Sequence, residues 1–149
     1  MKIRGERHYL WRAVDQDGDV IDILVQRYRN ARAAKRFFRK LLKGQGSKPW
    51  QLVTDKLKSY GAAHRSIMPS VEHNTEPYAN NLAELSHQPT RQRERQMRGF
   101  KSAGQAQRVL SVQGVIRNLF NLGRHQLRSE NYRLLRERSF REWSAATAA

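Results

Sequence analysis

The stretch that decides the fold is residues 8–27, which read His-Tyr-Leu-Trp-Arg-Ala-Val-Asp-Gln-Asp-Gly-Asp-Val-Ile-Asp-Ile-Leu-Val-Gln-Arg. Residues 8–14 and 20–27 are rich in aromatic and aliphatic side chains, which is typical of β-strands. Between them, Asp17-Gly18 lies in a polar turn. Asp-Gly between two apolar runs is a strong hairpin signal, so the sequence predicts two antiparallel strands here.

A helix and a short strand are predicted to follow the hairpin. Asn30 can cap the start of the helix and Gly44 can end it. Its apolar stripe, at helical spacing, consists of Ala34, Phe37, Phe38, Leu41 and Leu42. Residues 50–54 then form a short apolar run, which predicts a buried strand that ends in Asp55.

The middle of the chain alternates between helical and irregular patterns. Residues 60–67 predict a short helix. Residues 68–77 hold two prolines and predict an irregular loop. A further helix is expected from Asn80, although Pro89 lies inside it and tends to kink a helix.

The last third of the sequence predicts helices. A long helix over residues 102–127 is expected to bury Val109, Val112, Ile116, Leu119 and Phe120. Residues 129–143 predict a last helix, with Tyr132, Leu135, Phe140 and Trp143 as its apolar side, and residues 144–149 a disordered tail. The fold class is therefore one α/β (α+β) domain over residues 1–143, with a mixed sheet that opens in an antiparallel hairpin, flanking helices and a helical C-terminus.

The charge of the chain points to nucleic acid as the partner. Its 149 residues include 29 Lys and Arg against 13 Asp and Glu, which gives a formal net charge of +16. Such a field attracts polyanions. The absence of cysteine excludes disulfides and cysteine-ligated zinc. No apolar run approaches the roughly 20 residues that span a bilayer, so we expect a cytoplasmic protein with no membrane partner.

Two carboxylates stand where a site could form. Asp55 follows a predicted strand, at the end where α/β folds place ligands. Glu84 lies near the start of a predicted helix. Each has a purely structural alternative, because Asp55 could cap the next segment and Glu84 could complement the helix dipole. His87 and Arg91 follow Glu84 at helical spacing, so the three share a face on which basic donors would lie beside a carboxylate.

Nearly the whole chain, from Lys2 to Trp143, resembles the catalytic domain of DDE transposases of bacterial insertion sequences, of the insertion-sequence-six type. The matching segments are Arg4-Gly5, Tyr9 to Asp15, Ala33 to Phe37, Thr54-Asp55-Lys56, Glu72-His73, Asn80-Asn81 through Glu84, and Gly99-Phe100-Lys101-Ser102. Each segment is short, but their order and combination are specific.

The resemblance implies a fold, an activity and a site. The fold would be ribonuclease-H-like, and the activity would be metal-dependent DNA cleavage and strand transfer with Mg²⁺ or Mn²⁺. Asp55 and Glu84 would be the second and third acidic metal ligands. Transposon ends and target DNA would be the partners, and the full-length family implies a homo-oligomer. The residues expected to contact DNA are His87, Arg91, Arg93, Arg95, Arg98 and Lys101.

Two departures from the family pattern bear on activity. The strand that carries the family's first catalytic Asp precedes the segment that matches Lys2 to Gly5, so we expect an N-terminally truncated copy that is inactive alone. Leu82 also stands where relatives carry a basic residue. The alternative function is a basic nucleic-acid-binding protein without enzymatic activity. The two differ in whether Asp55 and Glu84 come together to hold an ion.

Overall fold

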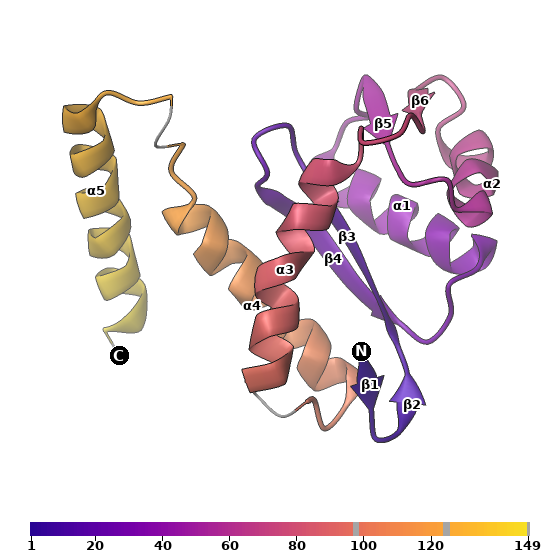
Figure 1. Ribbon diagram of the computed structural model, residues 1–149, viewed down its shortest axis with the longest axis horizontal. Helices are drawn as coiled ribbons and strands as arrows, with labels where there is room; N and C mark the ends of the chain where they lie inside the picture. Colours follow the sequence, from indigo (N-terminus) through magenta and orange to yellow (C-terminus); the bar gives the residue numbers. More distant parts are fainter. Residues whose placement is uncertain (97–98, 124–125, 149) are drawn as a thin grey trace.

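The computed structural model describes residues 1–96, 99–123 and 126–148. Figure 1 shows a mixed α/β arrangement in which helices lie around short strands. The strands are β1 (Lys2–Ile3), β2 (Glu6–Arg7), β3 (Tyr9–Val14), β4 (Val20–Gln26), β5 (Gln51–Val53) and β6 (Glu72–Asn74). The helices are α1 (Ala31–Gln45), α2 (Lys58–Ile67), α3 (Asn81–Gln96), α4 (Ala103–Phe120) and α5 (Ser129–Thr147). Within the described ranges, none of these helices is long and apolar enough to cross a membrane.

The predicted hairpin is confirmed. β3 and β4 pair antiparallel from Tyr9 opposite Gln26 to Val14 opposite Val20, with an irregularity near Val14. Asp15 organises the turn, because its Oδ1 accepts the backbone N–H groups of Asp17 and Asp19, each at 2.9 Å. A carboxylate that satisfies two turn amides fixes the register of the strands on either side.

The prediction of one mixed sheet is wrong. In the described parts of the chain, the strands form three separate two-stranded sheets, β1 with β2, β3 with β4, and β5 with β6. β5 and β6 run parallel, and β6 lies in residues 68–77, which the sequence predicted to be an irregular loop. β5 is less buried than expected, and Trp50 just before it is 82% exposed.

The first helix is confirmed, with a later end. The Asn30 side chain accepts the Ala33 N–H at 2.9 Å and so caps the helix. The helix continues past Gly44 to Gln45, and Gly46 takes the left-handed conformation (φ 69°) that ends it. Its inner face forms the first core, which contains Trp11, Ala33, Ala34, Phe37, Phe38, Ala63, Met68 and Val71.

The fourth helix packs by a different face from the one predicted. It ends at Phe120 rather than near residue 127, and it buries Ala106, Leu110 and Gly114. Val112, which was expected to be buried, is 57% exposed. The buried face meets Ile3, Ile23 and Phe100 in the second core.

Amide side chains of α4 pair with the backbone of β4. Asn118 donates to the Val20 carbonyl at 2.9 Å and accepts the Val20 N–H at 2.8 Å. Gln107 accepts the Val25 N–H at 2.8 Å and donates to the Ile23 carbonyl at 3.1 Å. These contacts supply partners for the edge of β4 that β3 does not cover.

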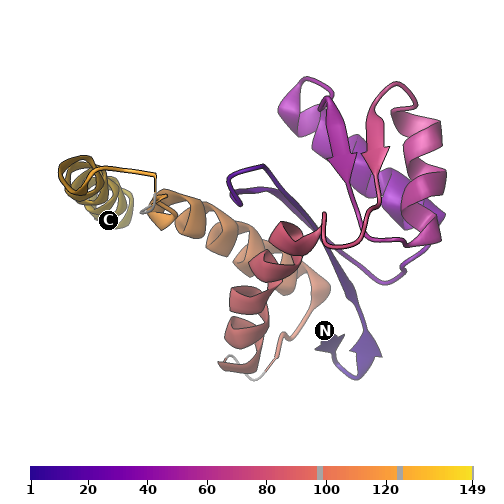
Figure 2. The ribbon, with the colours of Figure 1, turned by 45° about the horizontal axis from the view of Figure 1, so that its top comes forward.

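The last helix lies beyond the far end of α4, away from the strands and from α1, α2 and α3, in both ribbon views (Figures 1 and 2). It meets the end of α4 through Phe120, whose ring centroid lies 5.1 Å from that of Phe140 and 6.4 Å from that of Trp143. Phe140 nevertheless remains 48% exposed, so the predicted apolar side is only partly covered. Residues 144–147, expected to lie in a disordered tail, continue the helix.

Candidate functional site

Asp55 lies two residues beyond β5, at the edge where the parallel strands β5 and β6 both end. Its Oδ1 accepts the Leu57 N–H at 3.1 Å, in the turn before α2. The N-cap residue of α2 is Leu57, so Asp55 orders this turn but does not itself cap the helix. Its Oδ2 pairs with the Arg29 guanidinium at 3.0 Å. The Asp55 side chain is 37% exposed and that of Arg29 46%. Ion pairs this exposed contribute about 1 kcal/mol or less, so another cation could displace Arg29.

A cluster of packed aromatic side chains lies near Asp55. Tyr60 meets Trp11 edge-on at 5.2 Å and stacks against Phe38 at 5.9 Å, measured between ring centroids. Burial and the nearby Asp55 carboxylate, against the opposing effect of Arg29, raise the pKa of the Tyr60 hydroxyl to about 12. The packed aromatic rings therefore support the end of β5.

The third helix carries the remaining predicted site residues. It runs without a break through Pro89. Thr90 is buried and His87 partly buried, which identifies the side of α3 that faces the strands. Glu84, Arg91 and Arg95 are exposed. At about 100° per residue, Glu84, Arg91 and Arg95 project from one flank of the helix.

His87 lies on the side of α3 that faces β3 and is only partly exposed, so it is less accessible to DNA than the sequence predicted. Burial, together with the positive charges of Arg12 and Arg91, lowers the pKa of His87 to about 4. Arg12 of β3 donates from Nη1 to the Thr90 hydroxyl at 2.6 Å. Its own pKa is lowered to about 10, by burial and then by Arg117. His87 is therefore a neutral packing residue at the junction of β3 and α3 near pH 7.

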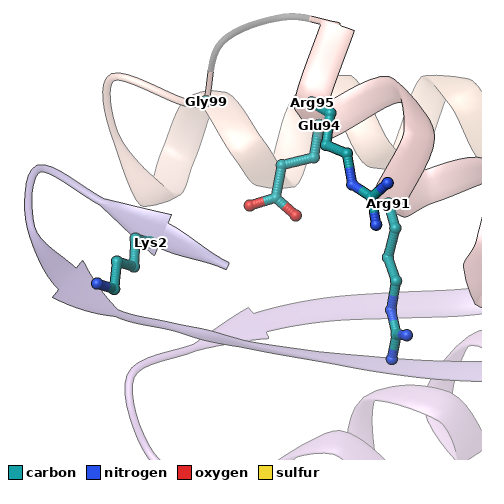
Figure 3. Close-up of a pocket in the computed structure, with 5 residues that line it drawn as sticks. All are labelled: Lys2, Arg91, Glu94, Arg95 and Gly99. Carbon is teal, nitrogen blue, oxygen red and sulfur yellow. The ribbon is translucent and has the colours of Figure 1, made fainter.

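A hollow of about 460 Å³ lies beside the exposed flank of α3. It is lined by Lys2, Arg91, Glu94, Arg95 and Gly99, and Figure 3 shows the Arg91 and Arg95 side chains on its α3 side. Arg93 is exposed but projects from the opposite flank at about 100° per residue. Lys101 is exposed and lines a second hollow with Arg4 and His8. Arg98 lies outside the described residues.

The described residues contain no group of three or more His, Asp or Glu side chains that could hold a metal ion. Asp55 and Glu84 are the carboxylates that the resemblance to the family implies as ligands. Their chemistry fits Mg²⁺ or Mn²⁺, which prefer hard oxygen donors.

Sequence reasoning missed the partners of these residues. Arg29 and Arg12 belong to other elements than the side chains they contact, and no local spacing links them. His73 was singled out as part of a motif but without a role, and the structure places it against Thr54, next to Asp55.

The comparisons with known proteins agree on one family. Residues 1–122 match a family described as a DDE domain. The chain is 31% identical over 108 residues to the transposase for insertion sequence-like element IS431mec of Staphylococcus aureus, a match that covers 69% of this chain and 48% of the relative. The transposase for insertion sequence element IS257 in transposon Tn4003, also from Staphylococcus aureus, matches to the same extent.

Two further findings concern solved structures and the length of the relatives. No solved structure matches the chain. The chain spans about half the length of the curated relatives it matches, since the aligned region covers 48% of them. The family match extends over both cores and over all the candidate site residues, from Asp55 to Lys101. The chain belongs to the DDE transposases of bacterial insertion sequences, of the insertion-sequence-six type.

Proposed function

We propose that this chain forms a ribonuclease-H-like catalytic region for metal-dependent DNA cleavage and strand transfer in insertion-sequence transposition, and that it is inactive on its own. One observation carries the proposal beyond family membership. The exposed flank of α3 carries Glu84 in its first turn. Arg91 and Arg95 follow on the same flank about two and three turns later, where they line a hollow with Lys2 and Glu94. A carboxylate and basic donors on one flank suit a phosphodiester substrate, because the carboxylate can hold a cation and the arginines can hold phosphates.

Asp55 and Glu84 are the proposed ligands of Mg²⁺ or Mn²⁺. Asp55 Oδ2 is held only by the exposed side chain of Arg29 among the contacts of the described residues, so an ion can compete for this oxygen. The Leu57 N–H keeps Oδ1 oriented. When bound, the metal would supply Lewis-acid stabilisation of phosphoryl transfer.

DNA is the proposed partner of the basic residues. Arg91 and Arg95 would hold phosphates on the flank of α3 that carries Glu84, and Lys101 would extend the contact toward β1 and β2. Arg93, on the other flank of α3, would contribute through its charge alone. Phosphate contacts of this kind fix the position of a duplex without reading its sequence.

Metal binding through Asp55 tests the proposal. Millimolar Mn²⁺ should raise the melting temperature of the chain, and a tenfold excess over Kd corresponds to roughly 3–6 °C for a protein of this size. Asp55→Asn should remove most of this rise, and so should Glu84→Gln. Arg29→Leu should enlarge it, because the competing cation is gone.

Asp17→Asn is the matched control, since it removes one exposed carboxylate from the hairpin turn. It should keep the full response to Mn²⁺. If Asp55→Asn and Glu84→Gln respond as fully as the control, the ions bind elsewhere. DNA binding without any metal response would favour the non-enzymatic nucleic-acid-binding alternative.

A further inference from the structure

Two histidine rings in contact with each other lie near the backbone that leads into Asp55. His64 of α2 and His73 of β6 have ring centroids 4.7 Å apart, tilted by 32°. His64 is buried and its Nε2 lies 2.7 Å from the Val71 carbonyl oxygen. His73 Nε2 lies 2.8 Å from the hydroxyl of Thr54, the residue before Asp55.

The hydrogen bonds determine which nitrogens carry protons. The Thr54 hydroxyl donates its one hydrogen to the Asp55 carbonyl oxygen at 2.9 Å. It must therefore accept from His73, whose proton lies on Nε2. A carbonyl oxygen can only accept, so His64 also carries its proton on Nε2. Burial, together with His64 and Arg65, lowers the pKa of His73, which favours this neutral donor form.

The end of β5 depends on this donor because its ladder is short. β5 and β6 pair over only three residues each. Beyond them, Thr54 N–H donates to the Asn74 carbonyl at 3.1 Å, and the buried Thr54 hydroxyl takes the bond from His73. Together these bonds hold the peptide group from which the Asp55 side chain projects.

We propose that His73 is a positioning residue for Asp55, which it holds through the Thr54 hydroxyl so that the carboxylate is presented at one fixed place. The role of the carboxylate in metal binding rests on the proposed function. The positioning itself does not, because the Leu57 N–H bond to Asp55 Oδ1 reports on the carboxylate without any metal.

Four variants separate positioning from general stability. His73→Leu removes the donor and keeps the bulk, whereas His73→Gln retains an amide N–H near the place of Nε2. Thr54→Val removes the hydroxyl with little change of shape, and Thr54→Ser retains it. His64→Leu is the control, since it breaks the bond to Val71 but leaves the link from His73 to Thr54.

Two readouts complete the test, both on the full chain well below its melting temperature. Amide hydrogen exchange at Leu57, corrected for global stability, should accelerate in His73→Leu and Thr54→Val but not in His73→Gln, Thr54→Ser or His64→Leu. Affinity for Mn²⁺, measured by titration calorimetry, should fall roughly tenfold or more in the first two variants, as it does when a group supporting a metal ligand is removed.

The outcomes distinguish the two proposals. Unchanged Leu57 exchange in both His73→Leu and Thr54→Val would overturn the positioning role, and so would an equal acceleration in His64→Leu. If Leu57 exchange responds as expected but Asp55→Asn leaves Mn²⁺ affinity unchanged, His73 positions Asp55 and the metal-binding proposal fails. If Asp55→Asn loses Mn²⁺ while His73→Leu exchanges and binds like wild type, the metal proposal stands and the positioning role fails.

Discussion

The exposed flank of α3 should account for a defined part of the salt dependence of DNA binding. The change to make is the double variant Arg91→Gln, Arg95→Gln. Both side chains line the hollow on the flank of α3 that carries Glu84, and one helical turn separates them. If each holds one phosphate of duplex DNA, each contributes about 0.9 to the slope of log affinity against log salt.

The magnitude follows from these two contacts. Removing them should make the slope less steep by about 1.8. Between 50 and 200 mM salt, the double variant should then lose about tenfold less affinity than wild type loses over the same range. The effect should be the same for duplexes of different sequence, because phosphate contacts carry no sequence information.

A charge-matched control makes this result decisive. Arg32→Gln, Arg36→Gln removes two exposed arginines one turn apart on α1 and lowers the net charge of +16 equally. Fluorescence anisotropy of a labelled duplex of about 20 base pairs, without divalent ions, measures both variants over a series of KCl concentrations. If both change the slope equally, the DNA senses only the overall charge and the assignment to α3 is wrong.

Further predictions concern stability, pH and catalysis. Asn118→Ala should lower the free energy of unfolding by about 1–3 kcal/mol in a urea titration, because it leaves the Val20 N–H and carbonyl unpaired at the edge of β4, and the exposed Asn81→Ala should cost much less. The pKa of His87 is lowered to about 4 in the folded chain, so the unfolded state binds more protons between about pH 6.5 and 4. Stability should therefore fall as pH falls through this window, and His87→Gln should flatten the melting-temperature profile there. With transposon-end DNA and Mn²⁺, we expect no cleavage above background, because two carboxylates hold a metal pair poorly. Cleavage that Glu84→Gln abolishes would show that these residues suffice.

Local signals explain why the hairpin and α1 were predictable. The Asp-Gly turn and the Asn30 cap each act within a few residues, and the structure uses both. The end of α1 shows the limit of such signals, because Gly44 and Gly46 are equally able to end a helix by type. Only Gly46 takes the left-handed conformation, after the inner face has buried Leu41.

The buried face of α4 could not be predicted because apolar residues occur on all sides of this helix. Several apolar stripes could have faced the core. The stripe that is buried contains Ala106 and Gly114 rather than the larger Val112. A Cβ atom on Gly114 would lie 3.2 Å from Val20 Cγ1, so a small residue is needed where α4 approaches β4. The same approach brings Gln107 and Asn118 to the strand edge. Hydrogen bonds to a partner strand decide this orientation, and a pattern of apolar residues does not show them.

The candidate site was predictable by position but not by surroundings. Asp55 was found because it follows a strand, and Glu84 because it opens a helix. Helical spacing then grouped Glu84 with both His87 and Arg91, which lie within about 60° of it around the axis. Packing separates them: the contact between Arg12 and Thr90 turns His87 toward β3 and leaves Glu84 and Arg91 on the exposed flank. The contact between Arg12 and Thr90 spans 78 residues of sequence and marks the side of α3 that faces β3, which helical spacing alone does not show.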